Sequence, residues 1–372
     1  MKVIIACGGT GGHLFPGLAV AEALISRQHH VRLLVSDKVV DRTALATSTI
    51  CSGPSRLDAR PVSAVGWDGS RRLIRFCHRL AKATKDCADI YGEFEPDAVL
   101  GMGGFTTAPA MLAARWRGTR ALIHESNAVP GKANRWVGRW AEHVALGMAE
   151  CARFFGRSHV TVTGTPIRSA LRHGKVAEAR KQLGLEDGRL TILVAGGSQG
   201  AHAINDAMAC ALPRLVEWKE RIQFVHLSGT SDESYMRDAY EKNEQVAKVM
   251  SFCNQMELAY SAADLVIGRS GAATLTEIAA FELPSILIPF PQAAGDHQLH
   301  NARAFQRAGA ARLIEQEQLS PLHATAGERL AGTIMELLND DGQRTRMSAA
   351  TRTLAVANAD QRIAMLIEDH AD

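Results

Sequence analysis

Short apolar runs alternate with glycine-rich or polar turns along the first half of the chain. Such runs are typical of strands in a parallel sheet, which are buried on both faces and lack in-out alternation. The predicted strands are residues 3–6, 31–35, 98–100, 121–123 and 160–162. A helix is expected from about Pro16 to Arg27, and this strand, loop, helix, strand order predicts a βαβ unit.

The same pattern starts again near residue 191. The strands predicted here are residues 191–195, 224–227, 249–252, 265–267 and 285–289. A glycine loop at 196–200 precedes a helix from about Ala203, and helical patterns cover residues 167–184 and the tail from about Leu330. Gly164 and Pro166 indicate a domain junction. We therefore expect the α/β fold class, with two Rossmann-like domains divided near Thr165.

Residues 268–301 contain candidate chemistry beside two predicted strands, at the carboxyl ends where open α/β sheets bind ligands. Thr274 and Glu277 have the spacing of a capping box, in which Glu277 would only close its own helix. Alternatively, the N–H groups at the helix start bind a phosphate and Glu277 binds a sugar diol. Asp296, His297, Gln298 and Asn301 add polar groups after the second strand.

Three further glycine or polar clusters follow predicted strands in the first half. They are residues 10–13, 103–105 and 124–127, and we expect them at one edge of one sheet. Glycine lacks a Cβ, so its backbone amides can approach an anion closely. Each cluster also fits a simple turn.

Residues 70–82 form an amphipathic helical pattern. Its apolar face comprises Leu73, Ile74, Phe76, Cys77, Leu80 and Ala81, and its basic face comprises Arg71, Arg72, Arg75, Arg79 and Lys82. One interpretation is a surface helix with a solvated basic face. The other is a helix that lies on anionic phospholipid, with Trp67 as a weak interfacial anchor.

Composition excludes several classes of protein. The 372 residues suffice for two domains, and 46% hydrophobic with 22% charged residues is globular. No apolar run reaches the ~18 residues of a membrane span, and the amino terminus lacks the pattern of a secretion signal. Seven cysteines without a C-x-x-C pair suggest reduced thiols in a cytoplasm. A net charge of +3, without a basic aromatic-rich run, argues against nucleic acid as a partner.

The motifs become more specific when taken in order. They are GGTGGHLFPGLAVAEAL, GMGGF, HESNAVPGKANR, GTPIR, GGSQGA, GRSGAATLTEIA and DHQLHNA. This ordered set closely resembles the MurG family of bacterial UDP-N-acetylglucosamine–N-acetylmuramyl-(pentapeptide) pyrophosphoryl-undecaprenol N-acetylglucosamine transferases. The resemblance runs from Val3 to about Ala311 and is less distinctive in the tail.

The resemblance implies a GT-B glycosyltransferase fold, with two parallel sheets facing across a cleft. Its acceptor domain would span residues 1–165, with a helix at about 355–372 packing back on it, and its donor domain residues 166–354. The implied reaction is inverting transfer of N-acetylglucosamine from UDP-N-acetylglucosamine to the 4-hydroxyl of the muramyl sugar of lipid I, which yields lipid II. No cofactor and no metal are implied. The absence of a D-x-D pair and of zinc-spaced histidines agrees with that.

The resemblance also assigns residues to the nucleotide-sugar donor. Ser198 would meet the diphosphate, Arg168 would hold the donor through its positive charge, and Glu277 would take the ribose hydroxyls. Backbone groups near Cys253 would contact the uracil, and Gln298, with Asp296, the sugar hydroxyls. The helix start, with Ala272, Ala273, Thr274, Leu275 and Thr276, would hold the phosphate and ribose. Thr10, Gly11, Gly12 and Asn127 would cover the sugar.

For the acceptor, the resemblance assigns Gly103, Gly104 and Phe105. His13 is the candidate general base, because histidine titrates near neutral pH, but it could equally bind the acceptor diphosphate or close a turn. Glu125 is the rival base. Ser126 stands where Gln is common in the family, Phe105 where Tyr is, and residues 106–108 replace the usual VSG.

The same donor motifs also fit other classes of protein. Other GT-B glycosyltransferases and UDP-sugar 2-epimerases share the donor glycines and Glu277, and a nucleotide-sugar-binding scaffold is a non-enzymatic alternative. A lipid acceptor favours the membrane interpretation of residues 70–82. The expected location is the cytoplasmic face of the cell membrane, with cell-wall assembly proteins as further partners.

Overall fold

The computed structural model describes residues 1–9, 11–37, 41, 57–63, 73–156, 158–168, 171, 174–197, 200–319 and 326–371. The chain forms two compact units. The N-terminal unit contains Met1–Arg168 and Val356–Asp372, and the C-terminal unit contains Ser169–Ala355. Among the described helices, none combines the length and the apolar character that crossing a membrane requires.

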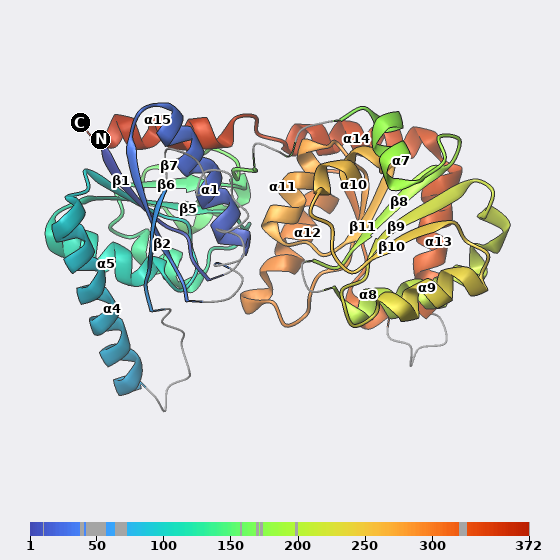
Figure 1. The fold of residues 1–372 in the computed structure, drawn as a ribbon, viewed down its shortest axis with the longest axis horizontal. Helices are drawn as coiled ribbons and strands as arrows, with labels where there is room; N and C mark the ends of the chain where they lie inside the picture. The colour runs from blue at the N-terminus through green and yellow to red at the C-terminus, as the bar shows by residue number, and fades with distance from the viewer. Residues whose placement is uncertain are drawn as a thin grey trace. The chain divides into compact units, whose positions relative to one another are not determined.

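The N-terminal unit is built on a seven-stranded parallel sheet in the order β3-β2-β1-β4-β5-β6-β7 (Figure 1). Its strands are β1 (Lys2–Ala6), β2 (His30–Val35), β3 (Asp58–Pro61), β4 (Ala98–Gly101), β5 (Arg120–Glu125), β6 (His143–Leu146) and β7 (Val160–Val162). Its helices are α1 (Gly11–Ser26), α4 (Leu73–Phe94), α5 (Thr107–Arg117), α6 (Lys132–Val137) and α15 (Ala359–Ala371), with the 3-10 helix η2 (Ala149–Phe154).

Alternate residues of β1 face two hydrophobic layers in this unit. Val3 and Ile5 pack with residues of α1 and α15, whereas Ile4 packs with residues of α4 and α5 on the opposite face. The C-terminal α15 is held there by buried Ile363 and Ile367. Both faces of the sheet are therefore covered, which is why its strands are apolar throughout.

The C-terminal unit repeats this topology with a six-stranded parallel sheet, β10-β9-β8-β11-β12-β13. Its strands are β8 (Leu190–Ala195), β9 (Ile222–Leu227), β10 (Ala247–Met250), β11 (Leu265–Gly268), β12 (Ser285–Leu287) and β13 (Ala311–Leu313). Its α-helices are α7 (Val176–Leu183), α8 (His202–Ala211), α9 (Glu233–Lys242), α10 (Met256–Ala262), α11 (Ala272–Ala280), α12 (His297–Arg307), α13 (Ala326–Asn339) and α14 (Asp341–Leu354). Short 3-10 turns are η3 (Leu212–Arg214), η4 (Val216–Trp218), η5 (Ala294–Asp296) and η6 (Gln316–Leu319).

Each sheet reverses its strand order at its first strand. In the N-terminal unit Ala6 of β1 is level with Gly101 of β4, and in the C-terminal unit Ala195 of β8 is level with Gly268 of β11. The carboxyl ends of such neighbouring strands are the usual ligand sites of open α/β sheets. All the glycine-rich loops predicted to carry chemistry leave the sheets at these ends.

Several predicted helix boundaries are wrong. The first helix begins at Gly11 and not at Pro16, because Leu14 and Leu18 bury against the sheet and this packing outweighs the low helix propensity of glycine. Helix α7 begins only at Val176, and the tail forms three helices. The predicted strand at 285–289 ends at Leu287.

The expected capping box at Thr274 is also wrong. Helix α11 begins one turn earlier, with Gly271 as its N-cap, so Thr274 lies inside the first turn. Glu277 accepts a hydrogen bond from the Tyr260 hydroxyl over 2.9 Å. Glu277 is therefore tied to α10 through a tertiary contact, which its spacing from Thr274 could not reveal.

Candidate functional site

The loops after β1 and β4 are tied together in the N-terminal unit. The Thr106 hydroxyl accepts a hydrogen bond from the Gly8 N–H over 3.0 Å and donates to the Gly8 carbonyl over 3.2 Å. The Gly9 N–H donates to Asp41 Oδ2 over 2.9 Å. Thr106 and Asp41 are fully buried. The bonds of Thr106 therefore hold the first glycine loop against the second, and Asp41 holds the first loop against the segment after β2.

His13 lies in the first turn of α1, beside this pair of loops. A Cβ atom built at Gly103 would lie 2.9 Å from His13 Nε2, and one built at Gly104 would lie 3.1 Å from His13 Nδ1. Gly103 and Gly104 also have positive φ angles of 99° and 77°. Only glycine therefore suits both the backbone conformation and the close approach of the imidazole. The structure brings His13, Gly103 and Gly104 together, as the sequence predicted from one sheet edge.

Glu125, at the end of β5, is almost fully buried and accepts four hydrogen bonds. Its Oε1 accepts from the backbone N–H and the Nδ2 of Asn127, and its Oε2 accepts from the Gly131 N–H and the Nδ2 of Asn134, all at 2.9 to 3.0 Å. The carboxylate thereby holds the 125–134 turn. Asn127 is thus oriented by Glu125.

His124 is fully buried on the same strand. Its Nε2 donates to the Gly164 carbonyl over 3.0 Å, and its Nδ1 lies 3.4 Å from Ser126 Oγ. Burial lowers the pKa of His124 to about 4, although the bond to Gly164 opposes that shift. Its neutral ring links the end of β5 to the 163–165 segment.

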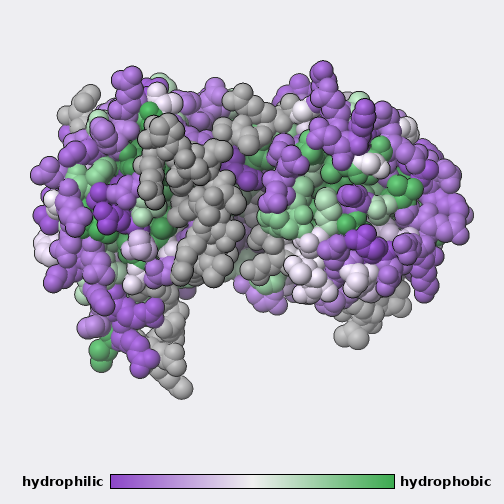
Figure 2. Space-filling model, viewed as in Figure 1, coloured by the Kyte–Doolittle hydropathy of each residue, from purple (hydrophilic) through white to green (hydrophobic). Residues whose placement is uncertain are grey.

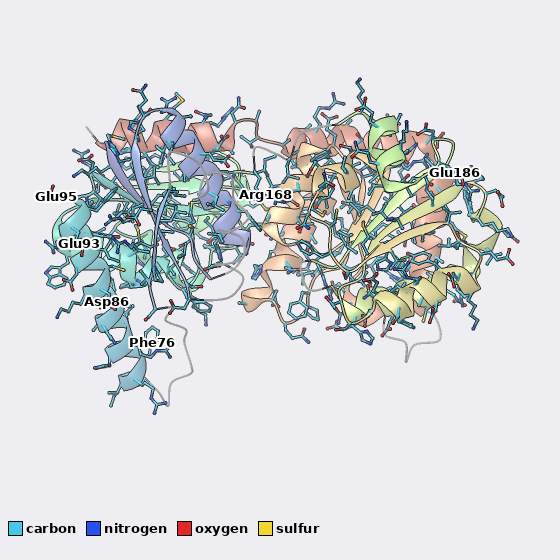
Figure 3. The ribbon with its side chains drawn as sticks, in the orientation of Figure 1. Phe76, Asp86, Glu93, Glu95, Arg168 and Glu186 are labelled. Carbon is cyan, nitrogen blue, oxygen red and sulfur yellow. The ribbon has the colours of Figure 1, made fainter. Side chains whose placement is uncertain are left out.

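The remaining described residues predicted for this unit lie at α1 or beside the first glycine loop. Gly11 and Gly12 open α1, and the Phe105 side chain is exposed. Arg168 is the last residue of the Met1–Arg168 segment of this unit (Figure 3). The Arg168 guanidinium stacks over the Phe15 ring at 4.7 Å, and its buried Nε has no hydrogen-bond partner among the described residues. Thr10 lies outside the described residues.

In the C-terminal unit, only the three residues 269–271 separate the end of β11 from the start of α11. Ala272, Ala273 and Thr274 occupy its first turn, where backbone N–H groups have no acceptor within the helix. This makes the helix start a site for an anion. The Leu275 side chain is buried in the core, and the Thr276 hydroxyl donates to the Ala272 carbonyl over 2.9 Å. The Leu275 N–H is also taken, because it donates to the Gly271 carbonyl over 3.0 Å, whereas the Thr276 hydroxyl oxygen can still accept a hydrogen bond.

The α12 end of the site is held by hydrogen bonds. Gln298 Oε1 accepts from the Phe290 N–H over 3.1 Å, and the Gln298 carbonyl accepts from the Ser270 hydroxyl over 2.8 Å. The Asn301 Nδ2 donates to the Ser270 carbonyl over 3.1 Å. Gln298 is thus joined to the turn that precedes α11.

Buried Arg269 supports the same turn. Its guanidinium donates to the carbonyls of Ile288 and Pro289 at 3.0 and 3.1 Å and to Gln316 Oε1 at 2.8 Å. Burial lowers the pKa of Arg269 to about 10. Cys253 follows β10 and is almost buried, and this burial raises the pKa of its thiol. Ser198 lies outside the described residues.

Sequence reasoning missed the residues that position the site. Thr106, Asp41, Asn134 and Tyr260 each hold a loop or a predicted site residue. Thr106 stands out in the sequence only as a departure from the family pattern, Asn134 lies unassigned within the motif HESNAVPGKANR, and Asp41 and Tyr260 have no local signal.

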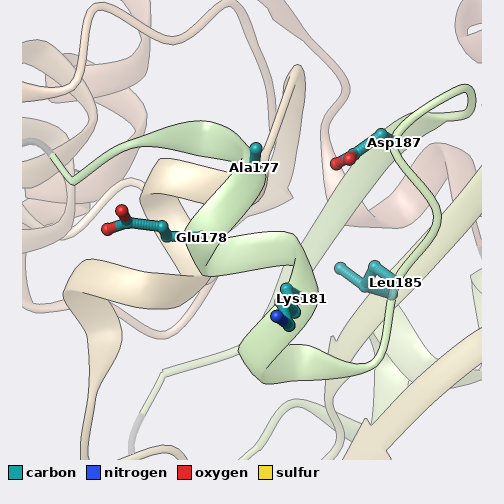
Figure 4. A pocket seen from close by; sticks show the side chains of 5 residues that line it. All are labelled: Ala177, Glu178, Lys181, Leu185 and Asp187. Carbon is teal, nitrogen blue, oxygen red and sulfur yellow. The ribbon is translucent and has the colours of Figure 1, made fainter.

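A depression on the surface of the C-terminal unit lies apart from these loops. This shallow depression, lined by Ala177, Glu178, Lys181, Leu185 and Asp187, lies beside α7 (Figure 4). It contains none of the predicted site residues. Within the described residues, His, Cys, Asp and Glu side chains form no group of three suited to a metal ion.

Comparison with known proteins places both units in one group. Residues 3–146 match the glycosyltransferase family 28 N-terminal domain, and residues 191–363 match the C-terminal domain of the same family. The UDP-N-acetylglucosamine–N-acetylmuramyl-(pentapeptide) pyrophosphoryl-undecaprenol N-acetylglucosamine transferase of Geotalea uraniireducens is 37% identical over 361 residues. This alignment covers 97% of this chain and 96% of that relative.

Solved structures give the same fold. MurG of Acinetobacter baumannii is 29% identical, with a TM-score of 0.77 and 99% of both chains covered. A UDP-N-acetylglucosamine 2-epimerase of Listeria monocytogenes reaches a TM-score of 0.72 at 16% identity, covering 99% of this chain and 96% of the other. The epimerase therefore shares the fold alone.

Proposed function

This chain belongs to glycosyltransferase family 28, together with the MurG transferases, and we propose from this that it transfers N-acetylglucosamine to lipid I. UDP-N-acetylglucosamine is the donor, and the 4-hydroxyl of the muramyl sugar is the acceptor. The product is lipid II. The observation that carries the proposal is 37% identity to a transferase of that name over 97% of the chain.

We assign the donor to the C-terminal unit. The free N–H groups at the start of α11 suit the negative charge of the UDP phosphates. Glu277, in the second turn of the helix and held by Tyr260, would accept hydrogen bonds from the ribose diol. Departing UDP gains charge as the sugar leaves. These amides, with Arg168, would stabilise that charge in a reaction that uses no metal.

The other donor assignments follow from the family resemblance. Gln298 would contact the sugar hydroxyls, and backbone near Cys253 would contact the uracil. Ser198 would meet the diphosphate. Residues of the N-terminal unit proposed to contact the donor sugar are Thr10, Gly11, Gly12 and Asn127.

We favour His13 over Glu125 as the general base. Both oxygens of Glu125 already accept two hydrogen bonds each, and the side chain is buried. Accepting a proton would weaken the turn that Glu125 holds. The His13 imidazole lies beside the Gly103 and Gly104 backbone, where the acceptor is proposed to bind with Phe105 at its edge. Glu125 would then act by orienting Asn127.

We also propose that the first turns of α4 lie on anionic phospholipid. Ile74 is 88% exposed, and Arg75, Arg79 and Lys82 are exposed on the same turns. Figure 2 shows apolar surface beside hydrophilic surface at this end of α4. Phe76, labelled in Figure 3, is half-buried and packs with Leu80 against the hydrophobic layer of the unit, so Ile74 is the apolar side chain offered to a lipid surface. Acidic residues, such as Asp86 and Glu93, are confined to later turns. The basic end therefore suits a negatively charged surface. Trp67, Arg71 and Arg72 lie outside the described residues.

The decisive experiment is transfer of radiolabelled N-acetylglucosamine to a short-chain lipid I analogue, with a chelator present. We expect turnover by the wild type despite the chelator. His13→Ala should lose turnover and keep donor binding, whereas Glu277→Ala should lose donor affinity. Glu125→Gln is the control for the rival base, because it keeps one acceptor oxygen. Tight binding of UDP-N-acetylglucosamine without any transfer would point to another acceptor.

A further inference from the structure

A chain of buried polar side chains runs through the C-terminal unit to the end of β9. The Tyr240 hydroxyl lies 2.9 Å from His226 Nδ1, and His226 Nε2 lies 3.0 Å from Asn205 Oδ1. Asn205 Nδ2 then donates to the Ser228 carbonyl over 2.9 Å. All four residues are buried. Buried polar groups are stable in a core only when they are hydrogen-bonded, so removing any one of these side chains leaves its neighbour without a partner.

The bonds made by Asn205 determine which group donates and which accepts in each of these hydrogen bonds. Its Nδ2 group donates one hydrogen to the Ser228 carbonyl and the other to Asp232 Oδ2 over 2.7 Å. The Asn205 Oδ1 must therefore accept the hydrogen bond from His226 Nε2. His226 therefore carries its proton on Nε2, and Nδ1 accepts from Tyr240. The imidazole is neutral, because burial lowers the pKa of His226 to about 3.

The Ser228 carbonyl, at the end of this hydrogen-bonded series, lies close against Gly200 in the glycine loop that follows β8. A Cβ atom built at Gly200 would lie only 2.2 Å from Ser228 O, and Gly200 has a φ of 75°. Gly200 also closes a turn by donating its N–H to the Gly197 carbonyl over 3.0 Å. The position of the Ser228 carbonyl thus determines where the loop can pass.

We propose that Asn205 and His226 are positioning residues for Gly200, which ends the glycine loop after β8. This rests on the proposed function, in which that loop faces the diphosphate of the UDP-sugar. Gly200 has no side chain that could hold its own position. Asn205 and His226 supply that support from outside by holding the Ser228 carbonyl against Gly200.

Four variants test this role by UDP binding, measured calorimetrically, and by steady-state kinetics. Asn205→Ala removes the donor to Ser228, and His226→Leu removes the partner that orients the Asn205 amide. His226→Gln keeps an amide donor in place of Nε2–H and should restore much of the loss. Tyr240→Phe is the matched control, because it breaks the chain only at its core end and leaves the bonds to Asn205 and Ser228 intact.

We expect Asn205→Ala and His226→Leu to raise the Kd for UDP and the KM for the donor about tenfold, equivalent to about 1.4 kcal/mol. Turnover at saturating donor should change much less. Tyr240→Phe should lower the melting temperature without changing either constant. Nitrogen-15 spectra of histidine-labelled protein should show two buried rings, those of His124 and His226, that stay neutral with the proton on Nε2 between about pH 5 and pH 8, and the His226 signal is assigned by its loss on substitution. That signal should be missing from both His226 variants.

An unchanged Kd in Asn205→Ala and His226→Leu, with a melting temperature lowered as in Tyr240→Phe, would show a merely structural role and overturn the inference. Equal loss in His226→Gln and His226→Leu would do the same. If Asn205→Ala does not fold, the two His226 variants and Tyr240→Phe decide the question. Failure of the wild type to bind UDP would overturn the proposed function itself, and this inference with it.

Discussion

The Tyr260 hydroxyl donates a hydrogen bond to Glu277 Oε2 over 2.9 Å, which joins α10 to the proposed ribose-binding carboxylate on α11. The Tyr260 ring also packs against Phe281, with ring centroids 5.3 Å apart. The hydroxyl therefore holds one rotamer of Glu277, while the ring belongs to the core. This separation makes the hydroxyl removable without a large change in packing.

Tyr260→Phe should therefore raise the Kd for UDP-N-acetylglucosamine about tenfold to 150-fold, because a hydrogen bond to a charged group contributes about 1.5–3 kcal/mol. Turnover at saturating donor should remain. Isothermal titration with the donor, alongside UDP-glucose as a second ligand, measures the effect. The rise in Kd caused by Glu277→Ala sets the upper limit for the effect of Tyr260→Phe, because it removes the carboxylate itself. A Kd equal to that of the wild type would mean that Glu277 does not need Tyr260 for its position.

Gly104→Ala should impair turnover through His13. The added Cβ would lie 2.8 Å from the Gly8 carbonyl and 3.1 Å from His13 Nδ1, so the imidazole or the loop must move. A displacement of this size at a catalytic group can cost about a hundredfold in rate. The measurement is kcat in the transfer assay, with donor affinity expected to stay unchanged.

Gly118→Ala is the matched control for that variant. Gly118 has a φ of 72°, close to the 77° of Gly104, but a Cβ there would meet nothing within 4 Å. Both variants should lose about 1–2 kcal/mol of stability from the left-handed backbone. Equal turnover in the two variants would show that the contact with His13 does not matter.

Unfolding should become easier in mild acid because of His124. Its pKa is about 4 in the folded protein against 6.5 for an exposed histidine, chiefly through burial. Between these values the unfolded chain binds a proton and the folded chain does not, so the free energy of unfolding falls as the pH falls from 6.5 to 4. Above 6.5 the ring is neutral in both states, and the loss, about 3 kcal/mol, is complete below 4.

Urea denaturation at several pH values checks this, with His124→Gln as the comparison. Glutamine does not titrate and can still donate to the Gly164 carbonyl. The stability difference between wild type and variant should therefore shrink as the pH is lowered. A difference that stays constant across this range would contradict a depressed pKa for His124.

Membrane association predicts that Ile74→Ser and Arg79→Ser weaken binding to vesicles containing phosphatidylglycerol. Each change removes an exposed group from the basic end of α4, and each cation near an anionic surface contributes about 1 kcal/mol. Vesicle sedimentation measures the effect. Val176→Ser is the control, because Val176 is 50% exposed but lies in the C-terminal unit. Equal binding by all three variants would exclude α4 as the contact.

Much of the fold could be predicted from local patterns. Buried parallel strands are continuous apolar runs, so the β1, β4, β8 and β11 strands were recognisable without tertiary information. The ends of the helices were harder to predict from the sequence. The start of α1 at Gly11 depends on Leu14 and Leu18 meeting the sheet, which residue propensities do not describe.

The sequence by itself determined the α/β class, the repeated βαβ pattern and, through the order of its motifs, the family. These depend on residues close in the chain or on motif order. Only the tertiary structure decided what individual side chains do. Thr106 and Gly8 lie 98 residues apart, and the donors that occupy Glu125 become neighbours only when the 125–134 turn closes. A hydrogen bond requires two atoms to meet in space, and distance along the chain does not specify that meeting.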